Sequence, residues 1–207
     1  MRIFCLLLLI RNIFGFNLAI VGASGGLGRE LVYQATNDMN LTVLGLTSKP
    51  SLIYEPYRGD GYVEVDFPPE YKSSNLVLQN YWSLINDNYD NIIFCTSAGP
   101  FEDDYSDRLT YKFLQDLPEN CKSIHLVSAY GAGDSLDNAN LGIQIMEKLY
   151  LKDVYRAKNR QEYLLNNLEK KVKKFIYRPK ALSYGNTFFE ATTRKELAED
   201  ILNNIII

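Results

Sequence analysis

Short apolar runs alternate with longer amphipathic segments along most of this 207-residue chain. Strands are predicted where the residues are continuously apolar or alternate with polar ones, at 18–21, 41–46, 62–67, 91–96, 123–127 and 174–177. Helices are predicted where polarity repeats with helical spacing, at 29–39, 73–86, 105–117, 153–168 and 193–204. Continuously apolar strands separated by helices are typical of a parallel sheet that is covered on both faces. The pattern therefore predicts an α/β fold with a doubly wound, mostly parallel sheet.

The chain shows no internal repeat and no linker, so we expect one domain over residues 17–207. Residues 1–16 are predicted to lie outside this domain as an apolar extension. Their apolar run, Ile3 to Ile10, has eight residues and is flanked by Arg2 and Arg11. A bilayer span needs about 20 residues, so no integral membrane span is expected. A targeting or anchor segment, a structured extension and an over-long start all remain open.

Composition limits which binding partners and which cellular compartment are expected. Hydrophobic residues make up 46% of the chain and charged residues 23%, which excludes a disordered protein. The net charge of −3 gives no basic footprint for a nucleic acid. Three separated cysteines and a single histidine favour neither disulfides nor a metal site. We therefore expect the cytoplasm or an organelle stroma or matrix rather than secretion, and the oligomeric state remains open.

The most informative motif is a run of glycines directly after the first predicted strand. Gly22, Gly25 and Gly28 are spaced G-x-x-G-x-x-G and lead into a predicted helix. Glycine permits a tight turn and a close approach of the backbone to a pyrophosphate, and the helix N-terminus attracts the phosphates. The motif predicts a dinucleotide site. The alternative is a tight turn in an α/β protein that binds no nucleotide.

The end of the second predicted strand bears on the choice of cofactor. An acidic side chain usually holds the ribose 2′-hydroxyl of NAD at this point. Thr47, Ser48 and Lys49 stand there instead, which suits a 2′-phosphate. The sequence therefore favours NADP(H) over NAD(H). If Lys49 is only a solvated surface residue, the choice remains open.

Four segments resemble a known family in their order along the chain. They are GASGGLG at 22–28, VSAYGAGDS at 127–135, AKNRQE at 157–162 and YRPKALSYG at 177–185. The chain resembles the atypical short-chain dehydrogenase/reductases, most nearly the NmrA-like and the flavin or biliverdin reductase-like NAD(P)-binding proteins. The resemblance covers about residues 18–204. It implies a Rossmann-type sheet and a small-molecule substrate.

The resemblance also implies roles for individual residues. The pyrophosphate would be lined by Gly22, Ser24, Gly25, Gly26, Leu27 and Gly28. The phosphate-bearing ribose would meet Thr47, Ser48 and Lys49, and the adenine Asp66 and Phe67. The nicotinamide and its ribose would be reached by Thr96, Ser97, Ala98 and Pro179. The family's catalytic serine and lysine would be Ser128 and Lys158.

One departure from the family pattern limits the expected chemistry. Ordinary members carry a proton-donating tyrosine four residues before the lysine, and Val154 stands there in this chain. Tyr155 is about 100° further round the helix, and Tyr130 and Tyr150 are other candidate donors. We therefore expect hydride transfer from NADP(H) to a small conjugated or aromatic acceptor that can take its proton from water. The alternative is a non-catalytic NADP(H)-binding sensor or assembly module.

Overall fold

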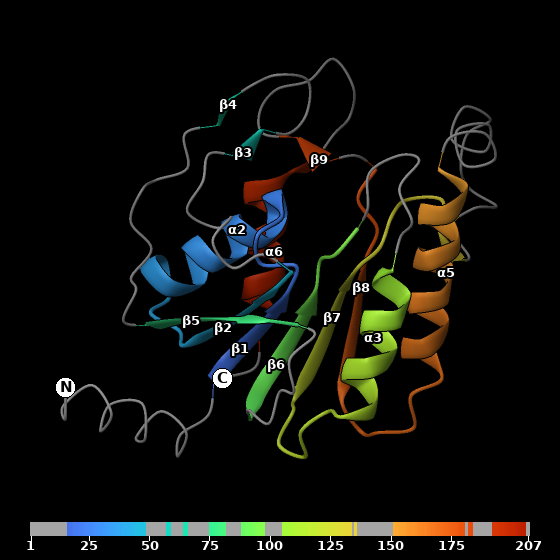
Figure 1. The fold of residues 1–207 in the computed structure, drawn as a ribbon, viewed down its shortest axis with the longest axis horizontal. Helices are drawn as coiled ribbons and strands as arrows, with labels where there is room; N and C mark the ends of the chain where they lie inside the picture. The colour runs from blue at the N-terminus through green and yellow to red at the C-terminus, as the bar shows by residue number, and fades with distance from the viewer. Residues whose placement is uncertain are drawn as a thin grey trace.

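A six-stranded parallel sheet forms the centre of the molecule (Figure 1). The computed structural model describes residues 16–48, 57–58, 64–65, 75–81, 88–97, 105–133, 135, 151–180, 182–183 and 192–205. The strands, in their order across the sheet, are β5 (Leu76–Asn80), β2 (Val43–Thr47), β1 (Phe16–Val21), β6 (Tyr89–Phe94), β7 (Ser123–Val127) and β8 (Lys173–Tyr177). Numbered along the chain, this is the order 3-2-1-4-5-6 of a Rossmann sheet. The predicted fold class is confirmed.

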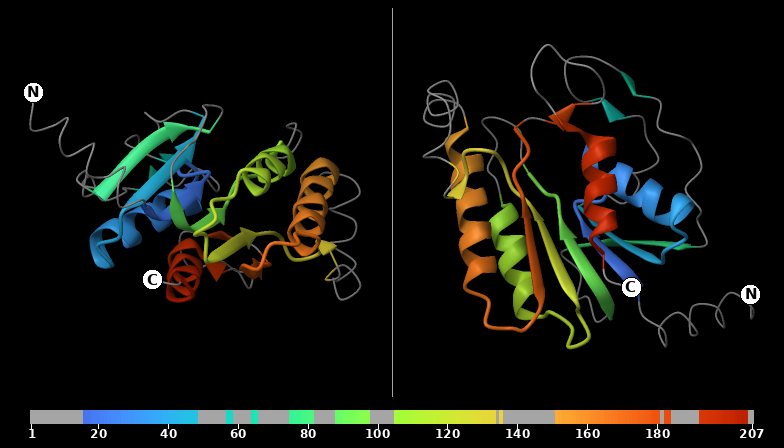
Figure 2. Two further views of the ribbon diagram at one scale, coloured as in Figure 1. Left: turned by 90° about the horizontal axis from the view of Figure 1, so that it is seen from below. Right: turned by 180° about the vertical axis from the view of Figure 1, so that it is seen from behind.

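Helices cover both faces of the sheet. On one face lie α2 (Gly26–Tyr33), its π-helical continuation η1 (Gln34–Asp38) and α6 (Arg194–Asn203); on the other lie α3 (Ser106–Gln115) and α5 (Lys152–Asn166) (Figure 2). Two small sheets lie apart from the main one: β3 (Tyr57–Arg58) with β4 (Glu64–Val65), and β9 (Leu182–Ser183) with β10 (Thr192–Thr193). Among the described residues, no helix is long and apolar enough to cross a membrane.

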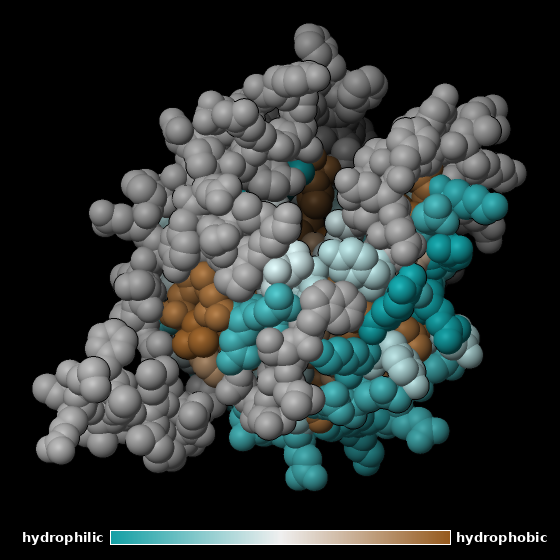
Figure 3. All heavy atoms as spheres, in the orientation of Figure 1, coloured by the Kyte–Doolittle hydropathy of each residue, from teal (hydrophilic) through white to brown (hydrophobic). Residues whose placement is uncertain are grey.

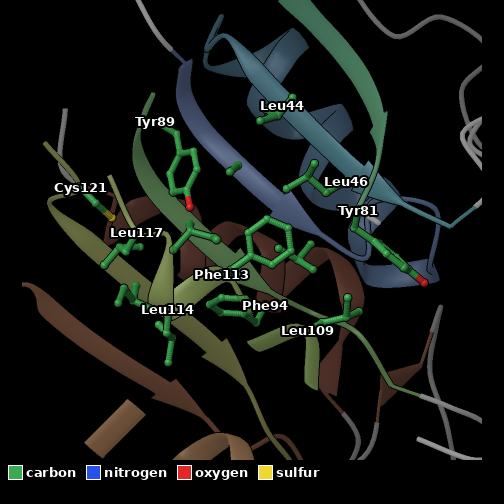
Figure 4. Close-up of a cluster of buried hydrophobic side chains, with 14 of the residues drawn as sticks. Leu44, Leu46, Tyr81, Tyr89, Phe94, Leu109, Phe113, Leu114, Leu117 and Cys121 are labelled. Carbon is green, nitrogen blue, oxygen red and sulfur yellow. The ribbon is translucent and has the colours of Figure 1, made fainter. Parts of the chain in front are cut away.

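Each face of the sheet has its own hydrophobic core. Leu18 and Ile20 of β1 pack with the apolar side of α2 and α6, whereas Ala19 and Val21 belong to the cluster under α3 and α5. In that second cluster the rings of Phe94 and Phe113 meet edge to face, with centroids 6.2 Å apart (Figure 4). Burial of both faces explains why the strand sequences are continuously apolar.

The predicted strand 62–67 contains β4 but is not the third strand of the main sheet, and the helix predicted after it was wrong. The third strand of the sheet is β5, which lies within the predicted helix 73–86, whereas β4 pairs with β3 in a small separate sheet. The reason lies in the pairing with β2, because Leu78 lies opposite Gly45. A Cβ atom on Gly45 would be 2.7 Å from Leu78 Cδ2, so the glycine gives this leucine its place. Pairing with a neighbour outweighs the local helical spacing here.

The other predicted helices and strands are present, with bounds shifted by a few residues. The helix predicted to start at residue 29 starts at Gly26, and Asn40 follows η1 in the left-handed conformation with φ 55°. The spacing of Thr193 and Glu196 in the sequence predicts a capping box at the start of α6, and the structure confirms it: Thr193 Oγ1 accepts a hydrogen bond from the Glu196 amide at 3.1 Å. Of the predicted N-terminal extension, residues 1–15 lie outside the described residues and Phe16 begins β1.

Candidate functional site

The glycine turn connects β1 to α2 at the point where the strand order reverses. Gly22 has φ +99°, and its amide donates to the Leu46 carbonyl oxygen at 2.8 Å. A Cβ atom there would be 3.0 Å from Thr96 Cγ2, so only glycine fits between β2 and the end of β6. Gly25 is the N-cap of α2 and has no side chain to cap the helix, and the first turn holds no acidic residue. The amides of this helix end therefore remain suited to an anion.

Gly28 brings α2 into direct contact with the turn. A Cβ atom on Gly28 would be 2.8 Å from Ala23 Cα and would overlap the Gly22 carbonyl oxygen. The helix axis can therefore lie close to the strand only because this side chain is absent. The three glycines serve different purposes: Gly22 for the turn, Gly25 for the exposed helix end and Gly28 for the packing.

A cavity of about 200 Å³ lies on one side of the glycine turn, at the ends of β1, β2 and β6. Ser24, Thr47 and Ser48 line it together with the turn. Ser24 Oγ and Thr47 Oγ1 share a hydrogen bond of 2.5 Å, which joins the turn to the end of β2. Ser48 is exposed in the cavity wall. We name this space the first cavity.

A second recess of about 360 Å³ lies on the other side of the turn, against the ends of β7 and β8. Three residues that the sequence analysis assigns to the nicotinamide end, Ser128, Lys158 and Pro179, line it. Gly25, Cys95 and Ser97 line both spaces, so the two form one cleft that crosses the glycine turn. In the space-filling view, a hollow with hydrophobic residues on its floor lies above this end of the sheet (Figure 3). Parallel sheets bind ligands at this place.

Lys158 comes from the buried side of α5 and reaches across two strand ends. Its ammonium group donates to the Thr96 carbonyl at 2.7 Å and to the Val127 carbonyl at 3.0 Å. These contacts hold the cation in the cleft wall, with only 4% of the residue exposed. Two buried hydroxyls nearby, Thr96 Oγ1 and Ser128 Oγ, have no hydrogen-bond partner among the described residues. Buried hydroxyls normally find a partner, and the hydroxyls and amide of a nicotinamide riboside would supply one, so the residues fit such a ligand.

The hydroxyl of Tyr155, a candidate for the missing proton donor, is engaged by the loop after β7. Both Val154 and Tyr155 line the second recess, but the Tyr155 hydroxyl donates to the Tyr130 carbonyl at 2.8 Å. The Tyr130 amide in turn donates to the Pro179 carbonyl at 3.0 Å. Tyr155 therefore connects α5 to the loop after β7, and Pro179 ties that loop to the end of β8.

The three C-terminal segments that carry the family resemblance meet in one cluster. Glu162 of α5 and Arg178 after β8 form a bidentate ion pair, with N–O distances of 3.0 and 2.7 Å. The Gly133 amide donates to Asn159 Oδ1 at 2.7 Å, and a Cβ atom on Gly133 would overlap Glu162 Oε2. These residues fix the loop after β7, which forms part of the recess wall.

Sequence reasoning missed two aromatic residues of the first cavity. Tyr81 directly follows β5, the position that the prediction gave to Asp66 and Phe67. Its hydroxyl lies 2.8 Å from that of Tyr105, and burial raises the pKa of Tyr81 to about 12. Figure 4 shows Tyr81 at the edge of the α3 core with its hydroxyl directed away from Phe113. A correct assignment of the third strand would have found Tyr81.

Several predicted site residues cannot be placed in the cleft. The site residues Lys49, Asp66, Phe67 and Ala98, and the alternative donor Tyr150, lie outside the described residues. Cys95 lines the cleft; its thiol donates to the Val21 carbonyl, and burial raises its pKa to about 12. Such a thiol is no nucleophile at neutral pH. Within the described residues, no group of three or more His, Cys, Asp or Glu could hold a metal ion.

Comparison with known proteins adds to this geometry. No protein-family model and no curated protein matches the chain. Solved structures do match. The oxidoreductase ylbE from Lactococcus lactis is 18% identical with a TM-score of 0.62, over 90% of this chain and 83% of that chain. The anaerobilin reductase ChuY from Escherichia coli O157:H7 is 13% identical with a TM-score of 0.61, over 90% and 88%.

The chain shares the Rossmann fold of these proteins. A further match is a short-chain dehydrogenase/reductase of wide type from Veillonella parvula in complex with NADP. It is 13% identical with a TM-score of 0.55, over 90% of this chain and 85% of that chain. The structural neighbours thus include proteins of the group that the sequence resembles, and the likeness to them extends through nearly the whole chain.

Proposed function

We propose that this protein is an NADP(H)-dependent oxidoreductase that reduces a small conjugated or aromatic acceptor. One observation carries the proposal: the uncapped N-terminus of α2 and the buried ammonium group of Lys158 line a single cleft at the strand switch point. The first suits a diphosphate and the second a ribose. A simple tight turn would need neither a cleft on both sides nor a buried lysine in its wall.

The chain's own residues would bind and orient rather than donate protons. Lys158 and Ser128 would hold the nicotinamide ribose, and the glycine turn the diphosphate. When bound, the dihydronicotinamide supplies a hydride, which is two electrons and one proton, and the acceptor takes a second proton from water. Val154 has no proton to give, and the Tyr155 hydroxyl is engaged by Tyr130. An acceptor that needs no strong general acid is therefore favoured.

The preference for NADP(H) rests on the end of β2. Thr47 is positioned by Ser24, Ser48 is exposed beside it in the first cavity, and Lys49 follows. We expect Ser48→Asp to weaken NADPH binding about tenfold, because an anion would face the 2′-phosphate, and to leave NADH binding nearly unchanged. Lys49→Glu should act in the same direction. Fluorescence titration with both cofactors measures this, with Ser48→Asn as the uncharged control; equal losses for both cofactors would contradict the preference.

The function itself is tested by titrating NADPH and then screening acceptors. We expect micromolar or tighter binding and NADPH oxidation with at least one flavin, quinone or linear tetrapyrrole. Tight binding without turnover of any acceptor would favour the second candidate, a non-catalytic NADP(H) sensor or assembly module, which Val154 and the engaged Tyr155 hydroxyl also suit. Absence of both binding and turnover would contradict both candidates.

A further inference from the structure

The first cavity is lined almost entirely by hydroxyl groups. Eight of the eleven residues that line it carry a hydroxyl, and the other three are two glycines and a cysteine. No ionised side chain lines it within the part of the chain that the structure describes. Hydroxyls can both donate and accept hydrogen bonds, so the directions in which they point determine which ligand they suit.

A pair of tyrosines joins two walls of this cavity. Tyr81 directly follows β5 and Tyr105 is the N-cap residue of α3, and their hydroxyls lie 2.8 Å apart. The Tyr81 amide donates to the Thr47 carbonyl at 3.3 Å, and Lys112 Nζ of α3 donates to the Tyr81 carbonyl at 2.7 Å. Tyr81 is buried, whereas Tyr105 lies at the surface. The pair is therefore fixed by β2 on one side and by α3 on the other.

The end of β5 also holds Ser48, the exposed residue that follows β2. Asn80 Nδ2 donates to the Ser48 carbonyl at 3.2 Å, and the Tyr81 hydroxyl is hydrogen-bonded to the Ser48 side chain. Burial raises the pKa of Tyr81 to about 12, so its phenol stays protonated at neutral pH. An exposed serine turns readily between its staggered rotamers, and the contact with a fixed phenol favours one of them.

The proposed function makes no use of the tyrosines. It assigns the 2′-phosphate of the cofactor to the end of β2, beside Ser48. Neither Tyr81 nor Tyr105 lies in any of the four segments on which the family resemblance rests. The tyrosine pair thus comes from elements outside those segments, and it contacts a residue that faces the proposed phosphate position.

We propose that the tyrosine pair, Tyr81 and Tyr105, determines cofactor specificity by positioning Ser48, whose hydroxyl it holds towards the 2′-phosphate of NADP(H). Both tyrosines are positioning residues, because they act through Ser48. A hydroxyl that is already oriented costs less to order when the anion binds, and hydrogen bonds to ionised oxygens are the stronger kind. The inference rests on the proposed function, which places the phosphate-bearing ribose in the first cavity.

The test uses two nucleotides that differ only in the 2′-phosphate, adenosine 2′,5′-bisphosphate and AMP, so that no hydride transfer is needed. Calorimetry on the whole chain measures both dissociation constants. We expect the wild type to prefer the bisphosphate about tenfold or more. Tyr81→Phe should reduce this preference about fivefold while AMP affinity stays within about twofold, and Tyr105→Phe should act in the same direction.

The matched control is Tyr111→Phe. Tyr111 is an exposed tyrosine of α3 whose hydroxyl accepts a hydrogen bond from Gln115 at 2.6 Å, and it does not line the cavity. Its loss should leave the preference unchanged. A double-mutant cycle then separates positioning from a purely structural role: Tyr81→Phe combined with Ser48→Ala should lower the preference no further than Ser48→Ala alone.

Three results would overturn the proposal: a wild-type preference near unity, an equal loss of both nucleotides in Tyr81→Phe, and additive effects of Tyr81→Phe and Ser48→Ala. Failure of the proposed function gives a different result. If NADPH binds without being oxidised, a bisphosphate preference that Tyr81→Phe reduces contradicts the oxidoreductase and still supports the tyrosine pair. NADPH oxidation with equal affinity for the two nucleotides would overturn only the tyrosine pair, and binding of neither nucleotide would contradict both.

Discussion

At the scale of single residues, the cleft contains side chains that we propose to bind the cofactor and side chains that fix the surrounding loop. Ser128 and Lys158 were predicted from the sequence and lie together in the second recess. For Tyr155, the position on the helix left open whether its hydroxyl donates a proton to the substrate or only holds the structure. The structure gives its hydroxyl to the Tyr130 carbonyl. Arg194 and Tyr81 could not be predicted, because their place in the cleft depends on α6 and β5 packing against distant parts of the chain.

Tyr155→Phe tests whether the tyrosine donates a proton. We expect kcat to change by less than about threefold, because a positioned general acid contributes roughly 100-fold or more and Tyr155 is not placed as one. Lys158→Ala, as the matched comparison, should weaken cofactor binding and lower kcat/KM more strongly. Steady-state kinetics with the best acceptor measures both. A hundredfold fall in kcat for Tyr155→Phe with unchanged NADPH affinity would show that it is the proton donor.

At the scale of elements, the sequence predicted the helices and strands that depend mainly on contacts between residues close together in the chain. The capping box of α6 is an example, since Thr193 and Glu196 are three residues apart. The sequence failed for β5, where the deciding contact is between Leu78 and Gly45, 33 positions earlier in the chain (78 − 45). No local pattern contains such a contact. Gly133, Glu162 and Arg178 lie in three separate segments that resemble the family. Their meeting in one cluster likewise could not be read from the sequence.

The Glu162–Arg178 pair should be a major source of stability for the loop that borders the recess. Glu162 is 3% exposed, so Arg178→Ala would leave a buried carboxylate without its guanidinium partner. We expect a loss of about 3 kcal/mol in the free energy of unfolding, measured with urea. The double variant Glu162→Gln with Arg178→Ala should be more stable than Arg178→Ala alone, because the buried charge is gone.

The control is Arg156→Ala. Its ion pair with Asp153 is exposed, with 69% and 55% of the two side chains accessible, and its loss should cost less than about 0.5 kcal/mol. A double variant no more stable than Arg178→Ala would mean that the carboxylate charge does not cause the loss.

At the scale of the whole molecule, a line of buried polar groups crosses the sheet beneath the cleft. The Asn91 amide donates to the Asn17 carbonyl at 2.9 Å, and the Ser123 hydroxyl donates to Asn91 Oδ1 at 2.6 Å. The His125 ring lies 2.8 Å from Ser123 Oγ and 3.1 Å from the Tyr177 hydroxyl. Four neighbouring strands are joined in this way. His125 lies in the apolar run SIHLV, which favours a hydrogen-bonded core histidine over a catalytic one, and it is fully buried in the sheet.

Because this row of polar groups contains the buried His125, we predict that the fold is less stable at acidic pH. Burial lowers the pKa of His125 from 6.5 to about 4, so the unfolded chain takes up the proton more readily. The stability from a neutral His125 is therefore complete above pH 6.5 and falls as the pH drops from 6.5 towards 4, by up to about 3 kcal/mol. Urea unfolding at several pH values measures this. His125→Gln should flatten that part of the curve; an unchanged slope would contradict the assignment.

The central claim is that the glycine turn and the start of α2 bind the diphosphate of a dinucleotide, and Gly25 tests it most directly. Gly25 has φ −72°, and a Cβ atom there would be 3.3 Å from the nearest atom, the Gly22 carbonyl oxygen. The Gly22 carbonyl must shift by a few tenths of an ångström to admit a Cβ atom, and both Asn and Asp are good N-caps, so each variant should fold. The decisive measurement is the NADPH dissociation constant of Gly25→Asn and Gly25→Asp by fluorescence titration. We predict that the Asp variant binds at least about tenfold more weakly than the Asn variant, because only its charge repels the diphosphate. Wild-type affinity in the Asp variant would contradict the account.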